Sequence, residues 1–282
     1  MKNRDTYIGG SEVAALVGVH PYLSAAAVWA RKLGLAEETP ENDMMLAGTL
    51  IQSSVFEMFR RRTNAITIAS EIWNGHPVHP NVGGTQDYIV EIDGARAVVE
   101  VKCAFTWASA QGWKHAGEGV VPEHYTCQLA YYREICGIDR GYFAALVQGE
   151  LKIVEAHHDA AGATLGRYLC ERAQAFWNAH VATRIPPEFD GSDSAGSALV
   201  AAFPANDGNM RAATESEIEL VERCRERARL RDVADAEYQR AMHALKSAIG
   251  TSDGLTLGDS DRVTWKADKR GRRIFRLGEN EE

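Results

Sequence analysis

The chain has 282 residues, of which 45% are hydrophobic and 25% are charged, enough to bury one substantial core and to carry an appended segment. The formal net charge of −8 excludes binding of nucleic acid through overall basicity, but it leaves room for a local basic patch. The five cysteines lack the paired spacing of a zinc site, and no apolar run approaches the roughly 18 residues of a membrane-spanning helix. We therefore expect reduced thiols in a soluble, intracellular protein that contacts no membrane.

The amino-terminal part of the chain is predicted to be helical. Ser11 and Ser24 stand where a side-chain cap starts a helix, which predicts short helices over 12–17 and 25–34. The segment 44–62 spaces its apolar residues at intervals of three and four, which predicts a long core helix with one apolar face. The residues of that face are Leu46, Leu50, Ile51, Val55, Phe56 and Phe59.

β-branched residues and turn-forming clusters dominate the middle of the chain. The segments rich in them are predicted to be three strands of one sheet, over 65–73, 85–92 and 97–103. The elements predicted to follow are a helix from Pro122 to Gly137, a hairpin of 141–147 and 151–156, and a helix over 162–181. This order predicts an α+β fold in which a mixed sheet is flanked by helices.

The composition changes again near residue 185. We predict a core domain over 1–185 and a linker over 186–210, because the latter range is rich in Pro, Gly, Ser and Asp. A charged helical extension is predicted over 211–250, interpreted as a solvated amphipathic helix, with a partner or oligomer surface as the alternative. The remainder, 251–282, is predicted to form a short β-like basic tail.

Two carboxylates and a lysine are placed to meet on adjacent strands. Side chains alternate along a strand, so Glu100 and Lys102 project from one face while Val99 and Val101 project from the other, toward the core. A hairpin turn between the strands brings Asp87 beside them, a costly cluster unless a divalent cation neutralises the acids. Hard oxygen ligands favour Mg²⁺ or Mn²⁺, with the Val101 carbonyl as a third oxygen, and Lys102 is suited to position the nucleophile of phosphodiester hydrolysis. The alternative is a solvated ion pair.

A second pair of polar residues lies on the helix that follows these strands. Gln128 and Tyr132 are four residues apart and therefore share one helix face. An amide and a phenol at this place are suited to hold a metal-bound water or a DNA backbone. The alternative is plain packing of this helix against the sheet.

Four motifs in this order resemble the YqaJ-type viral recombinase family, which is related to lambda exonuclease within the PD-(D/E)XK nucleases. The motifs are 9–18 with Pro21-Tyr22, Gly84-Thr85-Gln86-Asp87-Tyr88, Glu100-Val101-Lys102-Cys103, and Gln128. The resemblance covers 4–181 and implies a restriction-endonuclease-like core. It also implies Mg²⁺-dependent, 5′ to 3′ degradation of linear double-stranded DNA that produces single strands for phage-type recombination.

The resemblance also implies roles for individual residues. Asp87 and Glu100 match the metal ligands, Lys102 matches the catalytic lysine, and Gln128 with Tyr132 match a Q-x-x-x-Y motif of related recombination nucleases. Two further positions, Ser11 and Arg4, match the residues that recognise a terminal 5′ phosphate.

Two other features bear on this function. Gln52 stands four positions after a glycine, where the family has an acidic residue or a histidine, so a lower metal affinity is expected because an amide carries no charge. Between 261 and 276 the tail has seven basic residues against two acidic ones, so Arg270 and Arg273 are candidates to bind the DNA backbone.

Three functions remain open on this sequence. The first is a deoxyribonuclease of the cytoplasm of a bacterial or phage-infected cell, which acts on double-stranded DNA ends and works with a single-strand annealing protein, as a monomer or a homo-oligomer. The second is a catalytically impaired factor that binds DNA ends, motivated by Gln52. The third is a structural or assembly protein in which the Glu100 to Lys102 motif is incidental.

Overall fold

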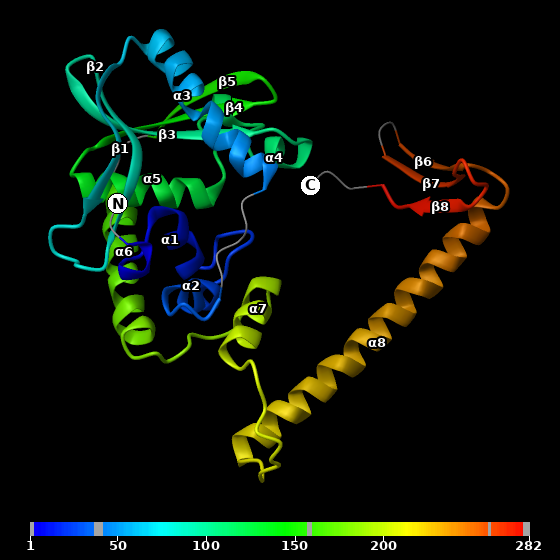
Figure 1. The fold of residues 1–282 in the computed structure, drawn as a ribbon. Helices are drawn as coiled ribbons and strands as arrows, with labels where there is room; N and C mark the ends of the chain where they lie inside the picture. Colours follow the sequence, from blue (N-terminus) through cyan, green and yellow to red (C-terminus); the bar gives the residue numbers. More distant parts are fainter. Residues whose placement is uncertain (1–2, 37–41, 157–159, 259–260, 279–282) are drawn as a thin grey trace. The chain divides into compact units, whose positions relative to one another are not determined.

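The computed structural model describes residues 3–36, 42–156, 160–258 and 261–278 (Figure 1). It divides into two compact units, Met1–Asn206 and Asp207–Glu282, which are described separately below. In the described residues no helix is long and apolar enough to cross a membrane. All five cysteines are free thiols.

The first unit is built on a five-stranded mixed sheet with the order β1-β2-β3-β4-β5. Its strands are β1 (Ile66–Gly75), β2 (Gly83–Ile92), β3 (Ala95–Ala104), β4 (Arg140–Val147) and β5 (Glu150–Ala156). Only β3 and β4 pair in parallel, and the other neighbours are antiparallel. A parallel pair needs a crossover, which contains α4 (Trp107–Gln111), η2 (Ala116–Glu118) and α5 (Glu123–Cys136). The predicted mixed sheet, with its strands and its hairpin, is confirmed.

Helices cover both faces of this sheet (Figure 1). On one face, α3 (Asp43–Thr63) packs Val55, Phe56 and Phe59 against alternate residues of β2 and β3, among them Val99 and Val101. The opposite face packs against α5, with α1, α2 and α6 beyond it. These helices are α1 (Gly10–Leu16), α2 (Ala25–Lys32) and α6 (Ala160–Phe176), the last continued by one π-helical turn (Trp177–Val181). Both faces of β3 are therefore buried, which places the strand of Glu100 in the interior.

Two predictions about helices need correction. The predicted apolar face of α3 is only half buried: Leu46 and Leu50 are exposed, because the amino-terminal half of this helix does not lie over the sheet core. The predicted linker contains α7 (Asp193–Ala202), whose Ala195 and Ala198 are buried against the core. Small residues let α7 pack closely on α2, where the Ser194 hydroxyl accepts from the Ser24 N–H at 2.9 Å.

The caps of the first two helices differ in how well they match the sequence. Ser24 caps α2 as predicted, because its hydroxyl accepts from the Ala27 N–H at 3.1 Å. Helix α1 begins two residues earlier than expected, at Gly10, and Ser11 lies inside it rather than at its cap. The Glu12 carboxylate instead accepts from the Gly9 N–H at 2.8 Å, which closes the first turn.

The second unit consists of α8 (Glu215–Ile249) and a three-stranded antiparallel sheet of β6 (Gly254–Leu257), β7 (Asp261–Ala267) and β8 (Arg273–Arg276). Thr214 caps α8, since its hydroxyl accepts from the Glu217 N–H. The predicted charged helix and β-like tail are both present. Most of α8 is exposed within this unit, and its buried residue is Ile249 at the end next to the small sheet.

Candidate active site

Asp87, Glu100 and Lys102 meet at the centre of the five-stranded sheet. The antiparallel register of β2 and β3 pairs Tyr88 with Val99, which sets Asp87 beside Glu100 on the next strand. An Asp87 carboxylate oxygen accepts from the Val101 N–H at 2.8 Å. The Lys102 ammonium donates to Glu100 Oε1 at 2.8 Å, so the structure brings together all three residues predicted from the sequence.

Helix α5 adds two polar side chains to this cluster. Gln128 Nε2 donates to Glu100 Oε1 at 2.5 Å, and Gln128 Oε1 accepts from Lys102 at 3.0 Å, so the amide bridges the acid and the amine. The Tyr132 hydroxyl is hydrogen-bonded to Gln128, and burial raises the pKa of Tyr132, which keeps this phenol protonated at neutral pH. The predicted pair on one helix face therefore lies in the site.

The position of Tyr132 explains two glycines of the sequence motifs. A Cβ on either Gly10 or Gly84 would lie 2.5 Å from a carbon of the Tyr132 ring, closer than real side-chain atoms approach. Helix α1 and strand β2 therefore close on this ring only because both positions lack a side chain. This close approach links the amino-terminal motif to the cluster around Glu100.

Burial governs the charges of the cluster. The Glu100 side chain is 2% exposed, and burial together with the Asp87 charge raises its pKa to about 7. Burial also raises the pKa of Asp87, against the opposing effect of Lys102. For Lys102, burial alone would lower the pKa, but the charges of Glu100 and Asp87 outweigh it and raise that pKa. The cluster thus holds a permanent cation beside two acids that are costly to ionise without a further positive charge.

The donor set fits a hard divalent cation. Glu100 Oε2 is buried and has no hydrogen-bond partner among the described residues, whereas Oε1 of the same carboxylate accepts from Lys102 and Gln128. Gln52 on α3 hydrogen-bonds to Asp87, which places its amide in the same cluster. In the described part of the chain, no group of three or more His, Cys, Asp or Glu residues is placed to hold a metal ion. A cation would therefore rest on two carboxylates, with the Val101 carbonyl and the Gln52 amide as the uncharged oxygens.

Glu57, the acidic residue of α3 nearest to Gln52 in sequence, does not join this set. Its carboxylate is paired with Arg60 at 2.7 Å and Arg61 at 2.8 Å on the outer side of the helix. These two arginines lower the pKa of Glu57 to about 2. The helix therefore offers the cluster an amide in place of a carboxylate.

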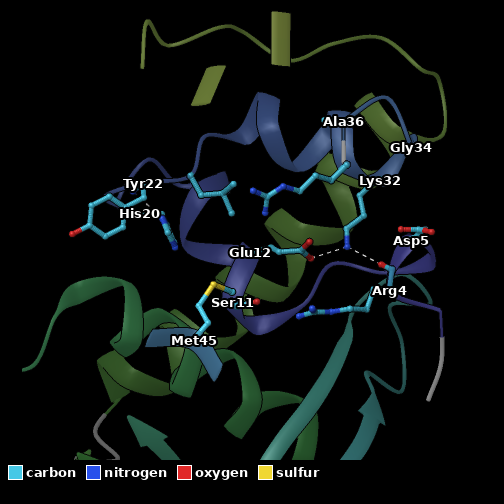
Figure 2. A pocket seen from close by; sticks show the side chains of 12 residues that line it. Arg4, Asp5, Ser11, Glu12, His20, Tyr22, Lys32, Gly34, Ala36 and Met45 are labelled. Atoms are coloured by element: carbon cyan, nitrogen blue, oxygen red, sulfur yellow. Dashed lines mark hydrogen bonds and ion pairs between the residues drawn. The ribbon is translucent and has the colours of Figure 1, made fainter. Parts of the chain in front are cut away.

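One cavity adjoins the cluster, and a second cavity shares part of its lining. One, of about 550 Å³, is lined by Gln52, Val101 and Lys102, together with residues from the amino-terminal half of α3. The other, of about 510 Å³, is lined by the predicted phosphate-binding residues Arg4 and Ser11 (Figure 2). The two residues that the resemblance implied are therefore brought together in one cavity.

The second cavity contains two cations that sequence reasoning missed. Arg31 and Lys32, from the last turn of α2, line it together with Arg4. Figure 2 shows Lys32 beside Arg4. Lys32 is held in place by Glu12 at 2.8 Å and by the Arg4 carbonyl at 2.7 Å. A pair of cations at the end of a helix is ordinary in a sequence, because it suits the helix dipole. Only the packing of α2 beside η1 (Arg4–Thr6) reveals these two as part of a site.

The predicted cations of the tail have different environments in the second unit. Arg273 donates to the carbonyls of Trp265, Gly250 and Ser252, and its guanidinium lies 3.8 Å from the centre of the Trp265 ring. Its donors hold the small sheet together. Arg270 is exposed, and its backbone N–H donates to Asp268, so its side chain faces solvent at the β7–β8 turn.

The architecture is an α+β, exonuclease-like fold. Two crystal structures of the alkaline exonuclease LHK-Exo from Laribacter hongkongensis, one in complex with dAMP, are similar to this chain with a TM-score of 0.52 each. They are 20% and 19% identical in sequence, over 64% of this chain and 91% of theirs. Residues 1–139 match the model of the YqaJ-like viral recombinase domain, the family that the sequence motifs resemble. Among curated proteins, none matches the sequence.

Proposed function

We propose that the chain is a Mg²⁺- or Mn²⁺-dependent DNA exonuclease that digests linear double-stranded DNA from its 5′ ends and supplies single strands for recombination. The observation that carries this proposal is the buried Glu100 carboxylate, which has an oxygen without a partner among the described residues and lies beside both Asp87 and a charged lysine. A solvated ion pair would show neither the burial nor the unpaired oxygen. The match of residues 1–139 to the YqaJ-like viral recombinase domain supports the same conclusion.

The side chains of the cluster divide the work of phosphodiester hydrolysis. Asp87 and Glu100 would hold the cation, which when bound polarises the scissile phosphate and lowers the pKa of an attacking water. Lys102 presents a permanent ammonium, held by Glu100 and Gln128, to the developing negative charge on the phosphate. Tyr132 orients the Gln128 amide through a hydrogen bond, and this amide in turn holds Lys102 in one position.

The second cavity, lined by Arg4, Ser11, Arg31 and Lys32 and called the basic cavity below, supplies the preference for a DNA end. Arg4, Ser11, Arg31 and Lys32 would bind a terminal 5′ phosphate, since three cations and a hydroxyl line one cavity. Asp5 and Glu12 line it too, and Glu12 is paired with Lys32, so a phosphate would bind to Arg4 before Lys32. A strand held there by its first phosphate presents a nearby phosphodiester bond to Lys102. This arrangement gives 5′ to 3′ polarity. Separately, we propose that Arg270 at the β7–β8 turn contacts the duplex backbone, so that binding weakens as the salt concentration rises.

Digestion of linear duplex DNA tests the proposal. Asp87→Asn and Lys102→Met should each lower the rate of nucleotide release by about 100-fold or more with saturating Mg²⁺. Glu57→Gln is the control for Asp87→Asn, and Lys152→Met is the control for Lys102→Met. Each control removes the same charge as its matched variant, but from a surface ion pair. Digestion of 5′-phosphorylated ends but not of circular duplexes is expected, and equal rates for all four variants would refute the assignment.

Gln52 supports a second candidate, a factor that binds DNA ends without cutting them. Its amide hydrogen-bonds to Asp87 and adds no charge to the cation site, so the metal affinity of this chain is expected to be lower than that of a site with a third carboxylate. This candidate predicts binding of DNA ends and no hydrolysis with Mg²⁺ or Mn²⁺ at any concentration. The same digestion assay separates it from the first.

A further inference from the structure

The cavity next to the acidic cluster and the basic cavity share part of their lining. Tyr22 and Met45 line both, and Figure 2 shows these two residues at one side of the basic cavity, with Ser11 between Met45 and the cations. On the function proposed above, one cavity holds the terminal phosphate of a strand and the other holds the next phosphate. The nucleoside between these two phosphates must then pass the shared lining.

Four rings in successive contact connect the two cavities, and we call them the aromatic row: Tyr22, which lines both cavities, His20, which lines the basic one, His124, and Tyr125, which lines the other. The ring centres of His20 and Tyr22 are 6.4 Å apart, those of His20 and His124 are 5.4 Å apart, and those of His124 and Tyr125 are 4.0 Å apart. The row begins in the loop before α2, at the basic cavity, and ends on the first turn of α5. There the Lys102 ammonium lies 4.7 Å from the centre of the Tyr125 ring.

The aromatic row carries no charge at neutral pH, although cations flank it at both ends. Burial and the nearby Arg31 lower the pKa of His20, whose Nδ1 accepts from the Tyr22 N–H at 3.1 Å. Burial, His20 and Lys102 lower the pKa of His124 to about 4. From Arg31 to Lys102, the protein therefore presents first a cation, then neutral aromatic rings, and then a second cation. A nucleotide chain presents phosphate, nucleoside and phosphate in the same order.

Packing of the protein alone accounts for the three half-buried rings of the row but not for Tyr22. The Tyr22 side chain is 84% exposed, so its ring stabilises no core and is free to contact a ligand. We infer that the aromatic row is the binding subsite of the 5′-terminal nucleoside, on which its base stacks. This inference rests on the proposed function. Stacking recognises the face that all bases share, so no preference for one base is expected.

Binding of two DNA probes tests the subsite without catalysis. Both probes are 5′-phosphorylated duplexes with one unpaired nucleotide at the 5′ end, and in one of them that nucleotide is abasic. Affinities of the full chain are measured by fluorescence anisotropy in the presence of a chelator. We expect the wild-type chain to bind the abasic probe at least about fivefold more weakly, which is the lower end of the loss seen when one stacked base is removed.

Variants assign this preference to the aromatic row. Tyr22→Ala and His124→Ala should each reduce the discrimination between the probes, whereas Tyr168→Ala, which removes an exposed tyrosine of α6, should retain it. Melting curves confirm that the variants fold. Equal wild-type affinity for the two probes, no binding of either, or full discrimination in both row variants would overturn the inference. The digestion assay fails or succeeds independently, because it needs the metal and this assay excludes it.

Discussion

The buried Glu100 carboxylate predicts an unusual dependence of stability on pH. Its pKa is about 7 in the folded chain against an ordinary value of 4.5, because burial and Asp87 oppose its ionisation. Between these two values the folded protein keeps a proton that the unfolded chain has lost, so the free energy of unfolding falls as the pH rises through this window. The difference between the two pKa values corresponds to a loss of about 3 kcal/mol, complete above pH 7.

Comparison with Glu100→Gln isolates this contribution. The variant cannot ionise at this position, so the difference in unfolding free energy between wild type and variant should shift by about 3 kcal/mol against the wild type from pH 4 to pH 8. Urea denaturation with a chelator, followed by tryptophan fluorescence, measures it. Lys102 remains charged throughout this range, because its pKa is raised above an already high ordinary value. A difference that stays constant across the range would refute the reasoning that burial and Asp87 oppose the ionisation of Glu100.

Three further predictions concern the cation, the terminal phosphate and the core. Gln52→Glu should lower the Kd for Mn²⁺ by about tenfold or more in calorimetry at pH 8, since it adds a carboxylate next to Asp87; an unchanged Kd would exclude residue 52 from the metal site. Arg4→Ala should raise KM for 5′-phosphorylated ends toward the value for 5′-hydroxyl ends, and an equal effect on both ends would contradict its role. Phe59→Ala should lower the free energy of unfolding by about 3–5 kcal/mol in urea titrations, because this ring of α3 is fully buried against the sheet; a loss below about 1 kcal/mol would contradict this packing.

Most of the sheet could be predicted from the sequence because its signals are local. The β-branched segments and the turn at Asp93 and Gly94, which both adopt positive φ, define the hairpin of β2 and β3 without any knowledge of the rest. Once this hairpin forms, its register places Asp87 beside Glu100. The acidic pair and the lysine were therefore accessible to sequence reasoning, whereas their depth of burial was not, since it depends on helices packed on both faces.

The residues around the cluster were harder to predict because tertiary packing assembles them. Arg31 and Lys32 reach the basic cavity only because α2 is held against the core, where α7 packs on it. Helix α7 was hidden in a range whose composition is typical of a linker, since its buried residues are alanines rather than large apolar side chains. His20 and His124 are more than a hundred positions apart, and no local pattern connects them before α5 docks.

Helix α3 shows how a site disturbs a pattern that otherwise holds. Its carboxyl-terminal half packs on the sheet with Val55, Phe56 and Phe59, as the spacing predicted, but its amino-terminal half leaves apolar residues exposed. That exposed half lines the cavity beside the acidic cluster, through residues that include Met45 and Gln52. Of the exposed apolar residues in this half, Met44 and Met45 line that cavity whereas Leu46 and Leu50 do not, so contact with the proposed DNA strand accounts for the exposure of the two methionines alone.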